Sequence, residues 1–242
     1  MSTEPPMPSE TSHLILTLDT AGPACQAVVS DGPGVISAQS VAMLRGHGEA
    51  LVPMIEQVLT DASITYDDLD RIGVTVGPGS FTGMRVGLAA ARGYSATLNI
   101  PVVGIGTLEA MARSDQRESG INAVRCVAID ARNGLVYGQR FSADGVALEP
   151  ANVMADLVFA ASVTNGARLV GPATSIIAAL ARSAGKRITL GDTAQVPSAA
   201  ALAELAAIGD VTEKPKPLYL KPADAIAAKP AGLRIGLDTS AV

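Results

Sequence analysis

The stretch Arg71–Ile105, RIGVTVGPGSFTGMRVGLAAARGYSATLNIPVVGI, decides the fold of this 242-residue chain. It opens with a strand-like run at Arg71–Val76, passes through a glycine-rich loop and continues as a helix-like segment over Thr82–Leu98. The closing residues IPVVGI predict a second short strand. Strand, loop, helix and strand make a βαβ unit, whose two strands lie parallel in one sheet. The stretch therefore predicts an α/β lobe.

The segments on either side of this unit follow a common pattern. Upstream, three strands joined by short turns predict an antiparallel meander: HLILTLD (13–19), ACQAVVSDG (24–32) and GVISAQSVAM (34–43). Downstream, residues 123–150 repeat the order strand, Asp, hairpin, strand, glycine turn and strand, with the third strand after Gly145. Asp19 and Asp130 hold equivalent places in this repeat. We therefore expect two lobes of related topology.

Further helices and strands complete the expected architecture. A helix is predicted at His47–Ala62, where Leu51, Ile55, Val58 and Leu59 fall on one face. In the second half, helices at Val153–Ala161, Ala173–Ala184 and Ala199–Ile208 alternate with short strands at 167–171 and 186–190. This alternation of strand and helix is typical of an α/β lobe.

The predicted domain organisation has four parts. Residues 1–12 are polar and proline-rich, so we expect a disordered N-terminal arm. Residues 13–112 make the first α/β lobe, and residues 113–224 make a second, smaller α/β lobe. The helix near 199–208 belongs to the second lobe in sequence but could pack back on the first. Residues 225–242 are expected to form a flexible C-terminal tail.

Composition excludes several classes of protein. A formal net charge of -5 disfavours a broad nucleic-acid surface of the chain's own. Cys25 and Cys126 lie far apart without a Cys-x-x-Cys motif and no signal peptide is seen, which predicts a cytoplasmic protein with two buried thiols. No apolar run is long enough to span a membrane. His13 and His47 are not spaced as metal ligands, so no tight metal site is predicted.

The loop in VGPGSFTGMRVG (76–87) resembles known catalytic loops but fits none of them. A Walker A loop requires a Lys where Met84 follows Gly83, and a dinucleotide fingerprint requires two residues, not three, between the last two glycines. A nucleophile elbow requires its Ser one position later than Ser80. Pro78 also removes one backbone N–H from any anion-binding nest.

Two interpretations of this loop stay open. The N–H groups of Gly79, Ser80 and Phe81 could face an anion at the start of the helix. Alternatively, Ser80 or Thr82 caps the helix while the glycines allow a sharp reversal of the chain. The spacing favours the cap.

The two strand-end aspartates suggest a vestigial nucleotide site. Two-lobed phosphotransferases of the actin and sugar-kinase kind place carboxylates at such positions, next to glycine-rich phosphate-binding hairpins. Here Pro23 removes a donor from the first hairpin and Arg132 adds bulk to the second, so both look poor for phosphate. Alternatively, each Asp simply caps its own turn. The candidate set is Asp19, Thr20, Gly77, Gly79, Ser80 and Asp130.

Small residues recur along the helix that follows the loop. Gly83, Gly87, Ala90, Ala91 and Tyr94 lie on one face at helical spacing. Such a face lets a helix of a second protein molecule approach closely. Alternatively, the face packs against the sheet of the chain's own lobe. Both alternatives stay open at this point.

Taken together, these segments resemble the bacterial TsaB (YeaZ) family. The resemblance rests on ILTLDTA, RGHGEALVPMIEQVL, VGPGSFTGMRVGLAAARGYSATLNIPVVGIGTLEAMA, AIDARNGLVYGQRF and PLYLKPADA, in order from Leu14 to Asp224. Gly48 departs from the family pattern, which more often has Ser or Ala there. The resemblance implies an α/β actin-like/ribonuclease-H-like ATPase (ASKHA) fold, with two related lobes and mixed sheets.

The resemblance also implies a function in tRNA modification. A TsaB protein would be a non-catalytic dimerisation or scaffold subunit that pairs with the catalytic subunit TsaD and activates it. The complex makes N6-threonylcarbamoyladenosine (t6A) next to the anticodon, and the ATPase TsaE joins it. The chain would form a homodimer in isolation and meet tRNA only through the complex. No cofactor would bind tightly, and ATP or ADP would bind only at a shared interface of the complex.

In the family, the helices that match His47–Leu59 and Thr82–Leu98 form the pairing surface. The expected interface residues are His47, Glu49, Leu51, Met54, Ile55, Gly83, Arg85, Gly87, Ala90, Ala91 and Tyr94. One alternative function is an ATP-dependent small-molecule kinase of the same superfamily. A metallopeptidase is a remote third hypothesis, because the sequence supplies neither zinc ligands nor a Ser–His–Asp set.

Overall fold

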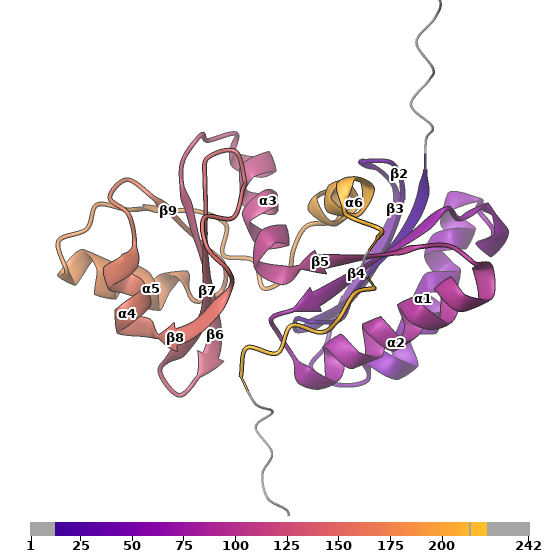
Figure 1. Ribbon diagram of the computed structural model, residues 1–242, viewed down its shortest axis with the longest axis horizontal. Coiled ribbons are helices and arrows are strands. Elements are labelled where there is room, and N and C mark those ends of the chain that lie inside the picture. The colour runs from indigo at the N-terminus through magenta and orange to yellow at the C-terminus, as the bar shows by residue number, and fades with distance from the viewer. Residues whose placement is uncertain (1–12, 213, 222–242) are drawn as a thin grey trace, which may run out of the picture.

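The computed structural model describes residues 13–212 and 214–221, which form two α/β lobes lying side by side (Figure 1). The predicted arm at 1–12 and the tail at 225–242 lie outside the described residues. The first lobe contains β1 (Leu14–Asp19), β2 (Ala24–Asp31), β3 (Gly34–Ala42), α1 (His47–Ala62), the 3-10 helix η1 (Tyr66–Asp68), β4 (Arg71–Gly77), α2 (Phe81–Leu98) and β5 (Val102–Gly106).

The rest of the chain supplies the second lobe and one helix of the first. Its elements are α3 (Thr107–Ser119), β6 (Arg125–Arg132), β7 (Leu135–Phe141), β8 (Asn152–Ala155), α4 (Asp156–Ser162), β9 (Arg168–Val170), α5 (Thr174–Ser183), β10 (Thr189–Leu190) and α6 (Ala199–Ile208). The two sheets have the orders β3-β2-β1-β4-β5 and β10-β9-β6-β7-β8.

The two sheets have the same topology. The strand that opens each lobe, β1 or β6, pairs antiparallel with the next strand and parallel with the crossover strand β4 or β9. The edge strands β3 and β8 extend the antiparallel side, and β5 and β10 extend the parallel side. The two related lobes with mixed sheets that the sequence predicted are therefore confirmed.

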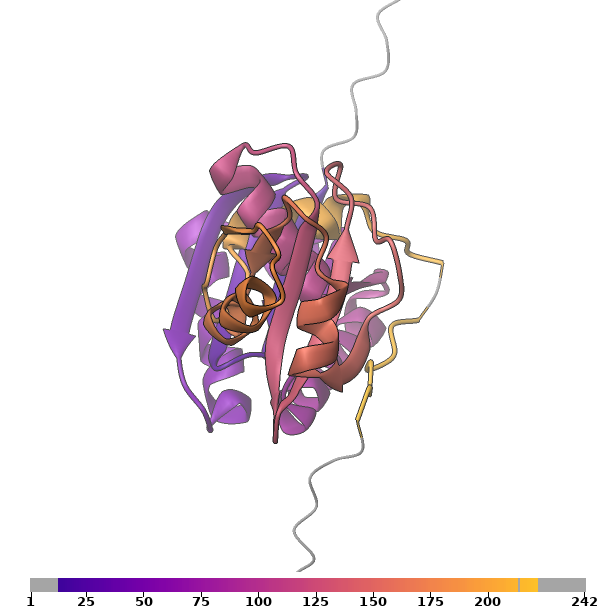
Figure 2. The ribbon, with the colours of Figure 1, turned by 90° about the vertical axis from the view of Figure 1, so that its left-hand side faces the viewer.

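Each sheet is covered by helices on both faces. The first sheet buries Leu18, Cys25 and Val29 beneath α1 and α2, and its opposite face packs on α6. The second sheet packs against α4 and α5 on one face, which lie nearest the viewer in Figure 2, and against α3 on the other. The core is built mainly from aliphatic side chains, many of them alanine and valine.

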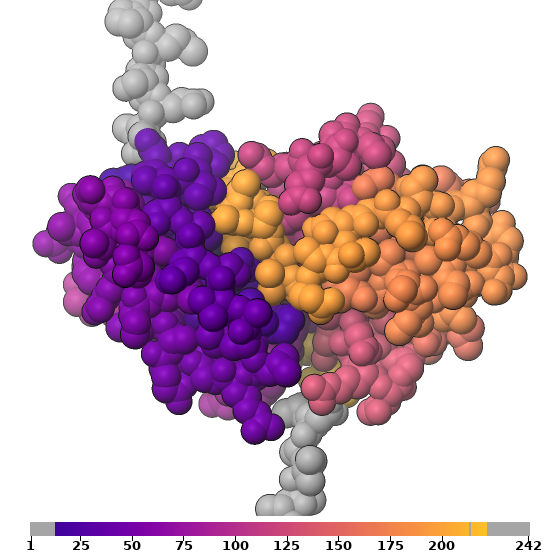
Figure 3. All heavy atoms as spheres, turned by 180° about the vertical axis from the view of Figure 1, so that it is seen from behind, coloured from indigo at the N-terminus to yellow at the C-terminus, as the bar shows by residue number. Residues whose placement is uncertain are grey.

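The helix α6 returns from the second lobe to the first. It contacts all five strands of the first sheet and also α3. Glu204 on α6 accepts hydrogen bonds from Arg113 and Arg117 of α3, at 2.8 and 2.6 Å. From behind, α6 and the segment leading to it lie between the two lobes (Figure 3). The two lobes are thus tied together by an element that each of them supports.

Several sequence predictions need correction. The third strand of the second lobe is β8, not the segment after Gly145, which turns back through a bond from Ser142 N to Val146 O and makes only an isolated bridge. Because β8 takes residues 152–155, α4 begins at Asp156 and not at Val153. The helix α3 was not predicted. The predicted lobe boundary after Ala112 falls inside α3. This helix packs against strands of both sheets, so it belongs to neither lobe alone.

A buried cluster of charges fixes α3 to the second sheet. The carboxylate of Asp115, which is 1% exposed, accepts bonds from Arg125 Nε at 2.9 Å, Arg168 Nη2 at 2.8 Å and the Asp192 N–H at 2.9 Å. Burial raises the pKa of Asp115, but these bonds and the charge of Arg168 outweigh it, so the pKa lies below its ordinary value. The cluster therefore joins α3, β6 and β9 through one carboxylate.

Replacing Asp115 with Asn should lower the stability at neutral pH by about 3–5 kcal/mol, because two buried arginines lose their counter-charge. A depressed carboxylate pKa gives stability that is present above about pH 4 and is lost as pH falls through the folded-state value. The difference between wild type and Asp115→Asn should therefore shrink below about pH 4. Urea unfolding followed by circular dichroism at several pH values measures it.

The matched control is Glu149→Gln, which breaks the pair with Arg140, whose two side chains are about one-third exposed. It should cost no more than about 1 kcal/mol. An Asp115→Asn deficit of the same size at pH 3 and pH 7 would contradict the proposed source of the stability.

Candidate functional site

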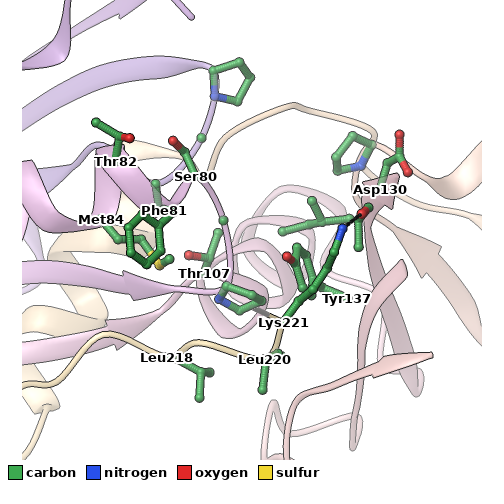
Figure 4. A pocket seen from close by; sticks show the side chains of 18 of the residues that line it. Ser80, Phe81, Thr82, Met84, Thr107, Asp130, Tyr137, Leu218, Leu220 and Lys221 are labelled. Carbon is green, nitrogen blue, oxygen red and sulfur yellow. Dashed lines mark hydrogen bonds between the residues drawn. The ribbon is translucent and has the colours of Figure 1, made fainter. Parts of the chain in front are cut away.

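A cleft with a volume of about 720 Å³ lies between the lobes. The first lobe lines it with the β1–β2 turn, the loop before α1 and the start of α2, and the second lobe lines it with the β6–β7 hairpin. Figure 4 shows Ser80, Phe81 and Thr107 on one side and Asp130 and Tyr137 on the other, with Lys221 between them. Leu218, Tyr219 and Leu220 of the same C-terminal segment also line the cleft. The cleft brings together residues that are far apart in sequence.

Ser80 caps α2 and is tied to the β1–β2 turn. Its Oγ accepts a bond from Gly83 N at 3.2 Å, and its backbone N–H donates to Ala21 O at 2.8 Å. The Thr20 hydroxyl donates to Gly83 O at 2.7 Å. A Cβ on Gly79 or Gly83 would collide with the carbonyl oxygens of Ala21 or Thr20. The capping interpretation of the loop is confirmed, and its glycines are needed for close approach of the turn.

The two repeat-related aspartates have different surroundings. Asp19 is fully buried and accepts bonds from Ala21 N at 3.0 Å, Gln26 Nε2 at 3.1 Å and Thr75 Oγ1 at 2.6 Å. Its carboxylate therefore serves the turn and does not line the cleft. Asp130 is exposed, lines the cleft and accepts a bond from its own hairpin, at Arg132 N.

The predicted vestigial nucleotide set is only partly assembled. Gly79, Ser80 and Asp130 line the cleft, whereas Asp19, Thr20 and Gly77 do not. Thr20 is buried against α2. Gly77 takes a φ of +106° where β4 ends, against the side chain of Met84. Asp19 and Asp130 therefore do not face a common ligand site in the cleft.

The small-residue stripe faces the chain's own sheet. A Cβ on Gly87 would lie 2.6 Å from Thr20 Oγ1 and 3.4 Å from a Val74 methyl group, and Ala91 is fully buried in the same core. Of the two alternatives left open by the sequence, packing against the sheet of the chain's own lobe is the one seen at Gly83, Gly87 and Ala91. Seven of the expected interface residues are buried within the lobe: His47, Leu51, Met54, Ile55, Gly83, Gly87 and Ala91.

The other expected interface residues reach the surface to different degrees. Glu49 and Arg85 are exposed, whereas Ala90 is half-buried and Tyr94 stacks on Tyr66 with ring centroids 5.3 Å apart. The outward sides of α1 and α2 carry residues that the sequence analysis missed: Val52, Pro53, Glu56, Ala89, Arg92, Gly93 and Ala96. Ala89, Gly93 and Ala96 also follow helical spacing, so the sequence contained a second small-residue face.

The C-terminal segment Lys214–Lys221, here named the strap, crosses from the first lobe to the second. Pro215 O accepts from Arg92 at 2.7 Å, and Leu218 N donates to Val76 O at 2.8 Å. Tyr219 packs on Phe81 with centroids 4.9 Å apart, and Lys221 Nζ donates to Ala131 O at 3.2 Å. The strap therefore forms a wall of the cleft and spans both lobes.

The cysteines offer no reactive thiol. Cys25 lies in β2 and Cys126 in β6, and both are free and buried, as predicted. Burial, together with the charge of Asp19, raises the pKa of Cys25 to about 11. Burial likewise raises the pKa of Cys126. Because a thiolate is the nucleophilic form, neither residue is suited to catalysis.

A known family model matches most of this chain. Residues 28–228 match the family model described as TsaD, tRNA N6-adenosine threonylcarbamoyltransferase. The chain belongs to this family, and within it to the TsaB (YeaZ) proteins. The resemblance noted in the sequence is thereby confirmed.

Curated relatives support the TsaB assignment. The TsaB protein of Escherichia coli strain K12 is 35% identical over 130 residues, which cover 54% of this chain and 55% of the relative. That of Bacillus subtilis strain 168 is 29% identical over 123 residues, covering 51% and 52%. The chain thus spans about half the length of the curated relatives that it matches.

Solved structures support the fold. YeaZ from Pseudomonas aeruginosa superposes with a TM-score of 0.74 at 24% identity, over 86% of this chain and all of that chain. Component A of (R)-2-hydroxyglutaryl-CoA dehydratase from Acidaminococcus fermentans has a TM-score of 0.50 at 9% identity, covering 82% and 98%. The expected actin-like ASKHA fold is confirmed. Within the described ranges, no helix is long and apolar enough to cross a membrane.

Replacing Gly87 with Leu should destabilise the first lobe by about 1–3 kcal/mol, because the new side chain overlaps Thr20 and Val74. Gly93 lies on the outward side of the same helix, where a Cβ would meet nothing within 4 Å. Gly93→Leu should therefore stabilise the helix by roughly 0.5–1 kcal/mol. Thermal unfolding of the two variants measures the contrast, and equal melting temperatures would contradict the burial of the stripe.

Proposed function

We propose that this protein is a non-catalytic subunit in t6A biosynthesis, which pairs with a TsaD protein through the outward face of α1 and α2. This face, here named the α1–α2 face, consists of Val52, Pro53, Glu56, Ala89, Arg92, Gly93 and Ala96. Membership of the TsaB proteins supports the pathway, since relatives carry that biosynthetic name. The exposure of this face is the observation that supports its assignment as the pairing surface.

The α1–α2 face has the properties of a helix-packing surface. Val52 is 45% exposed, and Pro53 beside it is exposed as well. On α2 the residues Ala89, Gly93 and Ala96 have almost no side chain, so the backbone of a partner helix could approach closely. Glu56 and Arg92 provide opposite charges on the same face. Apolar surface with small residues and a charged rim suits a protein partner.

The absence of catalysis in this subunit is supported by the cleft. A phosphotransferase of this fold would need both strand-end carboxylates to face its nucleotide, and Asp19 is enclosed by three hydrogen bonds. Pro23 in the first hairpin has no N–H for a phosphate, and Arg132 occupies the second. The alternative of an ATP-dependent small-molecule kinase is therefore weaker than a scaffold role.

The remaining parts of the proposal follow the TsaB resemblance. TsaE joins the pair, tRNA is met through the complex, and the isolated chain forms a homodimer through the same face. ATP or ADP binds only at an interface shared with a partner. The complex works in the cytoplasm.

The pairing surface is tested by the double substitution Ala89→Arg and Ala96→Arg. Two long charged side chains on the α1–α2 face should weaken association with TsaD by at least about 100-fold, because they prevent close approach. Size-exclusion chromatography with light scattering, with and without TsaD, measures this association and the homodimer. Circular dichroism checks that the variant is folded.

The matched control is Ala179→Arg, an exposed alanine on α5 of the second lobe. It should leave co-elution with TsaD unchanged. If the double variant co-elutes with TsaD as wild type does, the α1–α2 face is not the pairing surface.

A further inference from the structure

We propose that the mouth of the interlobe cleft is a docking site for an acidic segment of a partner protein that also carries an aromatic or aliphatic side chain. The cleft mouth is defined by Leu44, Arg45, Phe81, Arg85, Arg132 and Tyr219. It is separate from the α1–α2 face and does not rest on the pairing function proposed above. Its charge and its exposed apolar groups carry the inference.

The cleft mouth is basic in a chain with a formal net charge of -5. Arg45 comes from the loop before α1 and Arg132 from the β6–β7 turn, so the two lobes supply cations to one opening. Arg85 lies one turn into α2. In the part of the chain that the structure describes, no carboxylate forms an ion pair with these three arginines.

The negative charge beside them does not neutralise the opening. Asp130 is the one carboxylate among the described residues that line the cleft, and its Oδ1 accepts a bond from a backbone N–H. The start of α2 also opens here, and its first turn contains no acidic residue. The positive end of the helix dipole therefore adds to the arginines. An anionic group is the complement of this charge.

Exposed apolar side chains surround the same opening. Leu44 is 84% exposed, the largest exposure among the large hydrophobic side chains of the described residues. Phe81 and Tyr219 are 38% and 45% exposed although their rings pack together, and the guanidinium of Arg85 lies 5.3 Å from the Phe81 centroid. Arginine beside aromatic rings is the composition of the energetic centre of protein interfaces. A small anion alone would leave these side chains in water.

Two other anionic ligands fit less well. A free polyphosphate would need backbone donors from the hairpins, where Pro23 has none and Arg132 adds bulk. An RNA strand would need cations along a path of several phosphates. A strand continuing along α1, away from the cleft mouth, would meet the exposed carboxylates of Glu49, Glu56 and Asp61. A short peptide meets the charge and the apolar groups within one small area.

Fluorescence anisotropy with a labelled peptide of Glu, Phe and Leu tests the proposal, using the full-length protein. Wild type should bind this probe better than a peptide in which Lys replaces every Glu. Reversing two charges, with Arg45→Glu and Arg132→Glu together, should weaken binding at least about tenfold, and added salt should weaken wild-type binding. Leu44→Ser should weaken it severalfold through the lost apolar contact.

Matched controls separate the mouth from the overall charge. Arg182→Glu with Arg187→Glu makes the same charge change on an exposed part of the second lobe and should leave binding within about twofold. Leu157→Ser, at another exposed leucine, should also leave peptide binding unchanged. Circular dichroism verifies folding, and Arg45→Ala gives a milder variant if the reversed pair does not fold.

Four results would overturn the proposal: no binding of the acidic probe, equal loss in both charge-reversed pairs, tighter binding of an RNA oligonucleotide, or tighter binding of MgATP. The assay contains no TsaD, so its outcome is independent of the pairing test. The Ala89→Arg and Ala96→Arg variant should still bind the peptide, because those residues lie outside the cleft mouth.

Discussion

The close approach of the β1–β2 turn to α2 is the contact on which the first lobe depends. The carbonyl oxygens of Thr20 and Ala21 occupy the space where side chains of Gly83 and Gly79 would stand. Thr20 donates to Gly83 O and Ser80 N donates to Ala21 O, which fixes the direction in which α2 leaves the loop. That direction decides which side of α2 is buried, and so which residues remain available to a partner.

The second lobe repeats the topology without repeating this contact. Its crossover strand β9 has three residues, whereas β4 has seven. The loop after β9 bonds to β6 at Ala128, two residues before Asp130, through Ala173 N at 3.1 Å. The strand end at Asp130 therefore stays uncovered, while the equivalent Asp19 is enclosed. Two lobes with one topology thus present one buried and one open carboxylate, which removes the symmetry that a two-carboxylate nucleotide site would need.

The position of one lobe against the other depends on shared elements. The helix α3 packs on both sheets and is held by the buried carboxylate of Asp115, while the strap reaches from Arg92 to Ala131. These contacts hold the two lobes, and therefore the surfaces on them, in a fixed relative position. The α1–α2 face and the cleft mouth are fixed relative to each other as well, because both include residues of α2.

The sequence by itself indicated two related lobes, the meander and βαβ unit of the first lobe, and a helix cap at Ser80 or Thr82, because periodicity, turn residues and capping act over a few neighbouring residues. It also indicated that the hairpins suit phosphate poorly. Only the tertiary structure decided which of the two small-residue faces of α2 is buried, since both have helical spacing and the choice depends on Thr20, more than sixty residues away from Gly83. The tertiary structure also decided how α3 packs between the two sheets and which residues gather at the cleft mouth. The reason is that these contacts join segments that are distant in sequence and meet only on folding.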